Sequence, residues 1–187
     1  LCSCGSGPRI RPLADDDVVV AFGDSITAGH GAGAGESYPE VLAGLIGRDV
    51  VNEGVPGETT SEGLERLSDV LDEHQPALLI LSEGGNDMLR KESDDVIIAN
   101  LKAMIGLARE KGADILLVAE PRPALRLKTA GFYRDLAREL GVPCECEAIA
   151  EILSSPGLKS DQIHPNALGY EKLAQAVAKA MDTAAGP

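Results

Sequence analysis

The chain has 187 residues, of which 44% are apolar and 25% are charged, a composition typical of one globular domain and not of a disordered chain. Thirty acidic residues against seventeen basic ones give a net charge of −13, which would repel phosphates and anionic lipid headgroups and argues against a nucleic-acid partner. No run of about 18 apolar residues occurs, so the sequence predicts no membrane-spanning helix.

Residues 1–14 are rich in Gly, Ser and Pro and are predicted to be a flexible leader, followed by a single domain over residues 15–187. Leu1, Ser3 and Cys4 resemble the end of a bacterial lipoprotein signal with a lipid anchor on Cys4, although Cys2 fits that pattern poorly. A plain flexible leader is the alternative. We expect a location in the bacterial periplasm, in the cell envelope or outside the cell.

Short apolar runs alternate with segments of helical periodicity along the rest of the chain. The three clearest runs are continuously apolar and rich in Val, Ile and Leu, which is typical of parallel strands covered by helices on both faces. The predicted strands are 18–22, 50–51, 77–81, 115–119 and, more weakly, 142–146.

The segments between these runs repeat apolar residues at the spacing of one helix face. The apolar faces predict helices around 41–46, 64–71, 97–108, 136–140 and 170–181. Gly112 and Gly141 are predicted to end two of them. The alternation predicts an α/β domain, a three-layer α/β/α sandwich around a mainly five-stranded parallel sheet, with its site at the carboxyl ends of the strands.

Cys144 and Cys146 lie in the last short apolar run. Metal sites built on cysteine usually have C-x-x-C spacing with further ligands, so no metal site is expected here. We expect free thiols that are buried or half-buried, although the sequence does not decide their redox state.

The first chemical signal is Gly23-Asp24-Ser25-Ile26, directly after the first predicted strand. A serine at the carboxyl end of a strand, preceded by glycine and entering a helix, exposes its hydroxyl and its N–H to a crevice. The segment is not a G-x-S-x-G elbow, because Thr27 stands where the second glycine belongs. Taken alone, such a turn is more often a helix N-terminus than a nucleophile.

A second signal is Asp161-Gln162-Ile163-His164-Pro165, just before the last predicted helix. An Asp three residues before a His can bind one imidazole nitrogen and leave the other free as a general base. His164 could also be a simple turn residue. The other two histidines, His30 in a glycine-rich loop and His74 near the end of a helix, are expected to face solvent.

Two further loops follow predicted strands and therefore point to the same crevice. They are Asn52-Glu53-Gly54-Val55-Pro56-Gly57-Glu58-Thr59 and Gly84-Gly85-Asn86-Asp87. A glycine lets a backbone N–H approach a developing oxyanion, and an Asn amide adds a donor. Glycine and Asn are also ordinary turn residues, which is the alternative for each loop by itself.

Together, these four blocks resemble the SGNH hydrolases, also called the GDSL family, over nearly the whole chain after the leader. The segments look most like the bacterial branch with thioesterase I, arylesterase and lysophospholipase activities. The resemblance implies a flavodoxin-like SGNH hydrolase fold, with Ser25 as the nucleophile and His164 as the base oriented by Asp161. It also implies an oxyanion hole made by the N–H groups of Ser25 and Gly57 and the amide of Asn86.

The sequence departs from the family pattern at two positions: Ile26 replaces the usual Leu, and Glu83 stands where an apolar residue is common. Ile for Leu conserves volume. Glu83 could face solvent, pair with Arg90 or alter the charge of the pocket, and the sequence does not decide among these.

A rival interpretation is a dinucleotide-binding protein, because Gly29-His30-Gly31-Ala32-Gly33-Ala34 matches a loose G-x-G-x-x-A pattern and Glu53 follows about twenty residues later. Residues 23–28 separate the glycines from the strand, however, so a pyrophosphate would miss the helix N-terminus. A non-catalytic binding module on the same fold is a second rival. It is disfavoured because no catalytic element is missing.

The favoured function is a serine esterase that needs no metal or organic cofactor and works through an acyl-enzyme. With two Phe, three Tyr and no Trp, a deep aromatic pocket is not expected, which favours short- to medium-chain acyl groups. Specificity is expected to lie in loops 87–94 and 120–129. Thioesters, lysophospholipids and acetylated sugars all remain candidate substrates, and the sequence does not indicate an oligomeric state.

Overall fold

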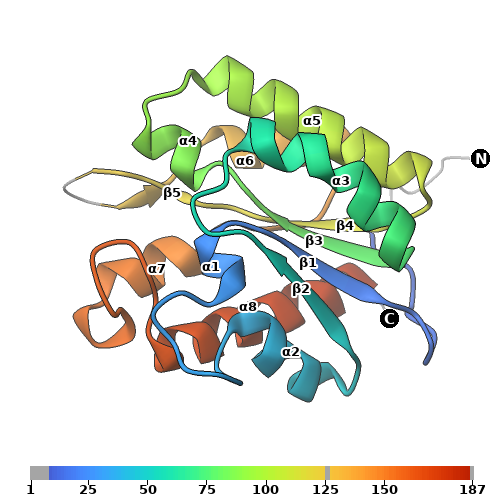
Figure 1. Ribbon diagram of the computed structural model, residues 1–187, viewed down its shortest axis with the longest axis horizontal. Coiled ribbons are helices and arrows are strands. Elements are labelled where there is room, and N and C mark those ends of the chain that lie inside the picture. Colours follow the sequence, from blue (N-terminus) through green and yellow to red (C-terminus); the bar gives the residue numbers. More distant parts are fainter. Residues whose placement is uncertain (1–8, 125–126, 186–187) are drawn as a thin grey trace, which may run out of the picture.

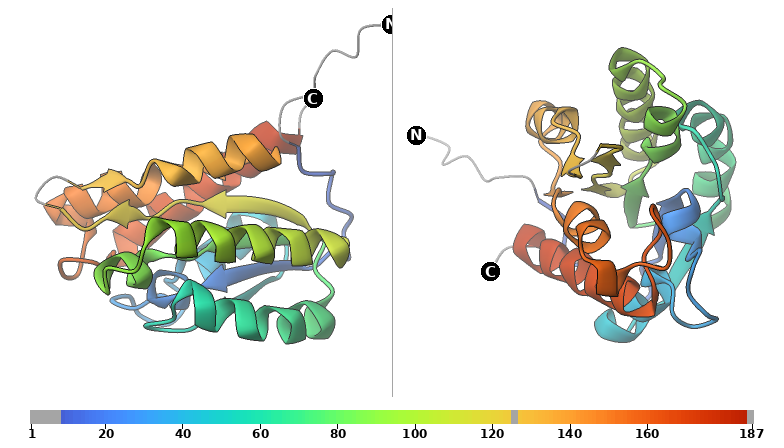
Figure 2. Two further views of the ribbon diagram at one scale, coloured as in Figure 1. Left: turned by 90° about the horizontal axis from the view of Figure 1, so that it is seen from above. Right: turned by 90° about the vertical axis from the view of Figure 1, so that its left-hand side faces the viewer.

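A computed structural model describes residues 9–124 and 127–185. Its centre is a five-stranded parallel sheet in the order β2-β1-β3-β4-β7, and helices cover both faces (Figures 1 and 2). The strands are β1 (Val19–Gly23), β2 (Val50–Gly54), β3 (Leu78–Ser82), β4 (Asp114–Val118) and β7 (Cys144–Glu145). This architecture confirms the predicted three-layer α/β/α fold.

The helices fall into two layers, which lie above and below the sheet in Figure 1. One layer contains α3 (Thr60–His74), α5 (Asp94–Glu110) and α6 (Phe132–Leu140), and the other contains α2 (Tyr38–Ile46), α7 (Ala148–Ser154) and α8 (Ala167–Ala185). Shorter elements lie at the carboxyl edge of the sheet or near it: α1 (Ser25–Ala28), α4 (Gly85–Leu89), the hairpin strands β5 (Pro121–Arg122) and β6 (Lys128–Thr129), and a 3₁₀ turn (Pro156–Leu158).

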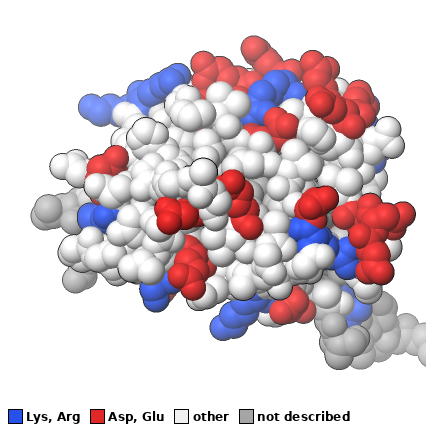
Figure 3. All heavy atoms as spheres, turned by 60° about the horizontal axis from the view of Figure 1, so that its bottom comes forward, with Lys and Arg blue, Asp and Glu red and all other residues white. Residues whose placement is uncertain are grey.

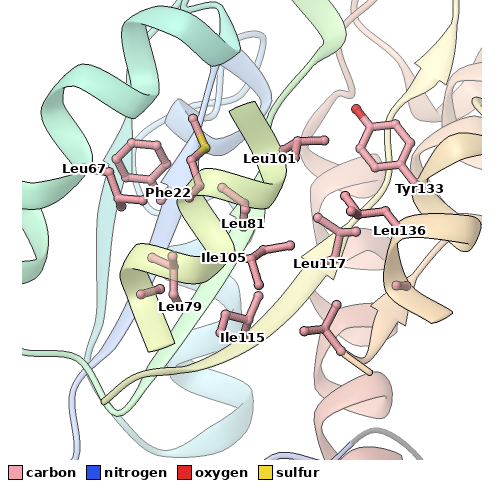
Figure 4. Close-up of a cluster of buried hydrophobic side chains, with 14 of the residues drawn as sticks. Phe22, Leu67, Leu79, Leu81, Leu101, Ile105, Ile115, Leu117, Tyr133 and Leu136 are labelled. Carbon is pink, nitrogen blue, oxygen red and sulfur yellow. The ribbon is translucent and has the colours of Figure 1, made fainter. Parts of the chain in front are cut away.

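The core is double because each buried strand directs alternate side chains to opposite faces. In β1, Val20 and Phe22 pack with α3 and α5, whereas Val19 and Ala21 pack with α2 and α8. Figure 4 shows the first of these clusters, where Phe22 lies beside Leu67 of α3. Burial of the central strands on both faces explains why their sequences are continuously apolar.

Residues just before the domain boundary predicted at position 14 also pack against the domain. Ile10 is buried with 3% of its surface exposed, and its N–H donates to the Ala184 carbonyl of α8 at 3.1 Å. Ile10, within the predicted leader, therefore packs against α8. The possible lipid anchor at Cys4 lies outside the described residues. Within the described part of the chain, no helix is long and apolar enough to cross a membrane.

The expectation of free thiols in the last strand is wrong, because Cys144 and Cys146 form a disulfide. Both residues are half-buried, as expected. Extended backbone places residues two apart on the same side of a strand, and here their Cα atoms are 5.5 Å apart, within the usual range for a disulfide.

Acidic side chains are spread over the face shown in Figure 3, with basic ones between them.

Candidate active site

The four sequence blocks meet at the carboxyl edge of the sheet. Strand register places Gly23 of β1 between Gly54 of β2 and Ser82 of β3. Ser25 follows β1, Gly57 follows β2 and Asn86 follows β3. Because the strands are parallel, residues far apart in sequence leave the sheet at one edge, as the alternation predicted.

A chain of hydrogen-bonding contacts joins three of the predicted site residues. Ser25 Oγ lies 3.0 Å from His164 Nε2, although 139 positions separate the two residues. His164 Nδ1 lies 2.8 Å from Asp161 Oδ2. A carboxylate beside one ring nitrogen holds the proton there and leaves the other nitrogen to accept a proton from the hydroxyl. The three side chains are therefore arranged for proton transfer from Ser25.

The loop before α8 orients Asp161 through its own backbone. Asp161 Oδ1 accepts hydrogen bonds from the N–H groups of Ile163 at 2.8 Å and His164 at 2.9 Å. Partial burial raises the pKa of Asp161, but the hydrogen bonds from the His164 ring and from these two N–H groups outweigh it and lower the pKa to about 2. Asp161 is therefore ionised at neutral pH and can hold the imidazole in place.

The serine begins a helix whose first turn is capped by its neighbour. Asp24 Oδ1 accepts from the Ile26 N–H at 2.9 Å, so Asp24 is the N-cap and Ser25 is the first helical residue. Among the described residues, the N–H groups of Ser25 and Gly57 have no hydrogen-bond acceptor. Gly57 has φ +83° with no atom near the place of a Cβ, so it is the backbone conformation, not space, that favours glycine there.

Asn86 is held more tightly than a free oxyanion donor would be. Its Nδ2 donates to Asp24 Oδ2 at 2.8 Å and to the Glu58 carbonyl at 2.9 Å. A primary amide has two N–H donors, so both already have acceptors. The sequence placed Asn86 at the site, but it gave no sign of these two partners.

A pocket of about 480 Å³, open to solvent at its mouth, lies beside Ser25 and His164. Its wall is mostly apolar, and two large apolar side chains at the rim, Leu89 and Ile163, are 44% and 42% exposed. Gln162 and Glu120 also line it. The two loops expected to set specificity both contribute, through Leu89 from the first and Glu120, Pro121, Pro123 and Leu127 from the second.

Two carboxyl groups near the site are buried, Glu120 in the pocket wall and Glu83, and the sequence did not indicate their burial. Glu83 is fully buried, and neither of its carboxyl oxygens has a hydrogen-bond partner among the described residues. Glu83 neither faces solvent nor pairs with Arg90, whose guanidinium instead donates to the Gly57 carbonyl. Burial, followed by the nearby Asp24 carboxyl, raises the pKa of both Glu83 and Glu120 well above the ordinary value.

This burial predicts a pH-dependent stability. A carboxyl whose pKa is higher in the folded state contributes no ionisation penalty below its unfolded pKa, and this penalty destabilises the fold increasingly as pH rises above that value. We expect Glu83→Gln to raise the free energy of unfolding at pH 8 by at least about 1 kcal/mol, roughly the scale of one pKa unit. At pH 4.5 the increase in the free energy of unfolding should be much smaller. Urea unfolding of wild type and Glu83→Gln at both pH values measures this increase.

The exposed Glu65 on α3 offers the matched control. Glu65→Gln removes the same charge from a solvated position, so its effect should be small at both pH values. An equal gain for Glu83→Gln at pH 4.5 and pH 8 would mean that ionisation of Glu83 does not limit stability.

The two remaining histidines differ from each other. His30 is exposed, as expected, but its ring lies against the His164 ring with centroids 4.3 Å apart. The expectation that His74 faces solvent is wrong: it is half-buried, and its Nε2 lies 2.9 Å from Glu53 Oε1. Glu53 of edge strand β2 thus contacts both Arg66 and His74 of α3.

The structure leaves the dinucleotide interpretation without a binding geometry. Strand β1 ends at Gly23 and helix α1 follows it at once, so the glycines 29–33 come after this helix. Glu53, the acidic residue of that pattern, instead contacts Arg66 and His74. A pyrophosphate at the glycine loop would therefore lie away from the helix N-terminus that follows the strand.

Comparison with known proteins gives a consistent result. Residues 21–172 match the model of the GDSL-like lipase/acylhydrolase family. An arylesterase of Vibrio mimicus is 30% identical over 172 residues, 86% of each chain. Thioesterase 1/protease 1/lysophospholipase L1 of Escherichia coli K12 is 31% identical over 158 residues, 80% of this chain and 76% of that one. The crystal structure of AlinE4, an SGNH-hydrolase family esterase, superposes with a TM-score of 0.72 at 32% identity and covers 94% of this chain and 100% of that chain.

Proposed function

This chain belongs to the GDSL-like lipase/acylhydrolase family and is a carboxylic ester hydrolase, and we propose that it works through a triad of Ser25, His164 and Asp161. The observation that carries the proposal is the unbroken chain of contacts from Ser25 Oγ through the His164 ring to Asp161, at 3.0 and 2.8 Å. The open pocket beside the serine gives an ester access to it.

In the proposed mechanism, His164 Nε2 removes the proton from Ser25 as Oγ attacks the ester carbonyl carbon. The C=O π electrons move onto the carbonyl oxygen, and the tetrahedral intermediate then collapses. The alcohol leaves with the proton returned by His164. Water repeats the same steps on the acyl-enzyme and releases the acid and free Ser25. Every proton transfer uses His164, so the scheme needs no metal or organic cofactor.

The developing oxyanion has three proposed donors. The N–H groups of Ser25 and Gly57 are free of acceptors in the described structure. The Asn86 amide is the third, and it has to share an N–H that also reaches Asp24 or Glu58. Because the oxyanion carries a full charge in a site of low polarity, it competes well for a shared donor.

The proposed substrates are esters with short- to medium-chain acyl groups. The pocket wall is mostly apolar, and its described residues include no Trp, Tyr or Phe. The arylesterase, thioesterase and lysophospholipase activities named for the relatives keep aryl esters, thioesters and lysophospholipids as candidates. Acetylated sugars are a further candidate class.

A series of p-nitrophenyl esters tests both the activity and the acyl preference. We expect kcat/KM for acyl chains of about two to eight carbons to exceed that for a sixteen-carbon chain by roughly tenfold or more, because a small pocket leaves the end of a long chain in water. An acyl-CoA and an acetylated sugar belong in the same screen. Preference for the sixteen-carbon ester would contradict the proposed specificity, and no hydrolysis of any ester would contradict the proposed triad.

We also propose that the protein works in an oxidising compartment, such as the bacterial periplasm or the outside of the cell. The Cys144–Cys146 disulfide supports this location, because reducing cytosol seldom preserves such a bond. The excess of acidic residues argues against a nucleic-acid partner, because negative charge on the protein repels phosphates.

A further inference from the structure

We propose that His30, Asp161 and His164 form a binding site for a borderline transition-metal cation such as Zn²⁺, and that the bound cation switches the esterase off. The inhibitory half of this proposal rests on the proposed catalytic role of His164. The binding half does not, and it can be tested on protein without a nucleophile.

The three side chains offer one ligand atom each, and these atoms lie within 4.8 Å of one another. The His30 and His164 rings are inclined at 51° with centroids 4.3 Å apart. Zn²⁺ binds imidazole nitrogen at about 2.0–2.1 Å, which places two ligands of a tetrahedral ion about 3.4 Å apart. A movement of roughly 1–1.5 Å is therefore enough to close the site. The exposed His30 side chain can supply it by rotating.

The backbone keeps His30 beside His164. The His30 N–H donates to the Ser25 carbonyl at 2.9 Å, and its carbonyl accepts from the Tyr170 hydroxyl at 2.7 Å. The next residue, Gly31, has φ +93°, and a Cβ there would collide with Ser160 Oγ. The glycine loop therefore packs closely on the loop that carries the other two ligands.

That second loop is anchored as firmly. The Ser160 N–H donates to the His164 carbonyl at 3.0 Å, and Asp161 Oδ1 holds the N–H groups of Ile163 and His164. All three ligand residues thus have a fixed backbone and need only small side-chain movements, which lowers the entropic cost of binding. The Asp161 side chain is 49% exposed, so a cation can reach the group from solvent.

The donor set selects the class of cation. Two imidazoles and one carboxylate suit Zn²⁺ and its borderline neighbours, whereas Mg²⁺ and Ca²⁺ prefer oxygen ligands alone. The net charge of −13 also favours the approach of a cation. Zn²⁺ is therefore the probe, and Mg²⁺ is the matched negative control.

Binding at His164 is incompatible with its role as a base. A neutral imidazole has one lone pair, and the proposed mechanism uses it to accept the Ser25 proton. Asp161 lies on the Nδ1 side of the His164 ring, whereas Nε2 faces Ser25, so a cation shared with Asp161 binds Nδ1. The proton of the neutral ring then moves from Nδ1 to Nε2, which can no longer accept the Ser25 proton. Binding therefore stops acyl transfer without blocking the pocket itself.

The activity test compares Zn²⁺ inhibition of wild type, His30→Gln and His74→Gln on a short-chain ester. His74 is a matched control, since it also lies beside a carboxylate but away from the pocket. We expect His30→Gln to need at least about tenfold more Zn²⁺ for half-inhibition, the lower limit for loss of even an outer partner of a metal. His74→Gln should behave as wild type, and Mg²⁺ should not inhibit any of the three.

Calorimetric titration of Ser25→Ala with Zn²⁺ tests binding without catalysis. We expect His30→Gln in the Ser25→Ala background to weaken the tightest site by at least about tenfold. Cys2 and Cys4 are present in every variant, so they cannot cause a difference between them. Equal titrations of the two proteins would overturn the metal site, as would activation by Zn²⁺ or equal inhibition of wild type and His30→Gln. An inactive wild type that still loses Zn²⁺ affinity on His30→Gln would overturn the proposed function and leave the site standing.

Discussion

Replacing Ser25 by Ala is expected to lower kcat on a short-chain ester by at least about 10⁴-fold. The Ser25 hydroxyl is the atom that forms the acyl bond in the proposed mechanism, and its Oγ contacts His164 Nε2 at 3.0 Å. Without it, only direct attack of water is left. The substitution removes a half-exposed oxygen, so the free energy of unfolding should change by less than about 1 kcal/mol. Stopped assays with matched amounts of folded protein measure kcat.

Ser154→Ala is a suitable control for the serine substitution. Among the residues that the structure describes, the Ser154 hydroxyl donates to the Ala150 carbonyl alone, one turn earlier in α7, at 2.7 Å. Its loss should leave kcat within about twofold, because the variant keeps every proposed catalytic group. A Ser25→Ala protein that retains more than about 1% of wild-type kcat, with contamination by other esterases excluded, contradicts nucleophilic catalysis by this residue.

Much of the fold could be predicted because the buried strands and the amphipathic helices carry strong patterns. Strands β1, β3 and β4 each contain an uninterrupted apolar run of four residues, and the apolar face of α5 repeats from Ile97 to Ala108. The edge strand β2 extends to Gly54, although only Val50 and Val51 were predicted. Asn52 and Glu53 lack an apolar signal because an edge strand is only half covered.

The short elements escaped prediction for a physical reason. Helices α4 and α7 have five and seven residues, too few for a helical period to be distinguished from chance. Helix α1, with four residues, was indicated only by the turn at Ser25. The two-residue strands β5 and β6 are likewise too short to show an alternation of apolar and polar residues. Residues of α1, α4, α7 and β5 nevertheless line the pocket, so its shape could not be derived from periodicity.

The proposed catalytic residues could be placed because each follows a strand or precedes a helix, and the parallel sheet brings those points together. The contact between His30 and His164 could not be placed in this way. It depends on how a glycine loop folds back over the sheet edge, which no local pattern encodes. The burial of Glu83 is similar, since its neighbours come from separate segments of the chain.

Asn86→Ala is expected to lower kcat by about 10² to 10³ with little change in KM. If the amide donates to the oxyanion, it meets a charge that exists only in the transition state, so kcat and kcat/KM fall together. The substitution also removes the donor to Asp24 Oδ2 and to the Glu58 carbonyl. That loss should cost about 1–3 kcal/mol of stability. Activity therefore has to be measured per folded molecule, with urea unfolding followed in parallel.

Tyr133→Phe separates the two effects of the Asn86 substitution. The buried Tyr133 hydroxyl donates to the Glu83 carbonyl at 2.6 Å, just before the Gly84-Gly85-Asn86 segment. Tyr133 does not line the pocket, however. Its loss should cost a similar amount of stability and leave kcat within a few-fold. If Asn86 serves only to tie Asp24 to the Glu58 carbonyl, the two variants should lose similar stability and keep similar kcat. A fall in kcat confined to Asn86→Ala would instead show that its amide acts on the reacting ester, despite the two acceptors that already hold it.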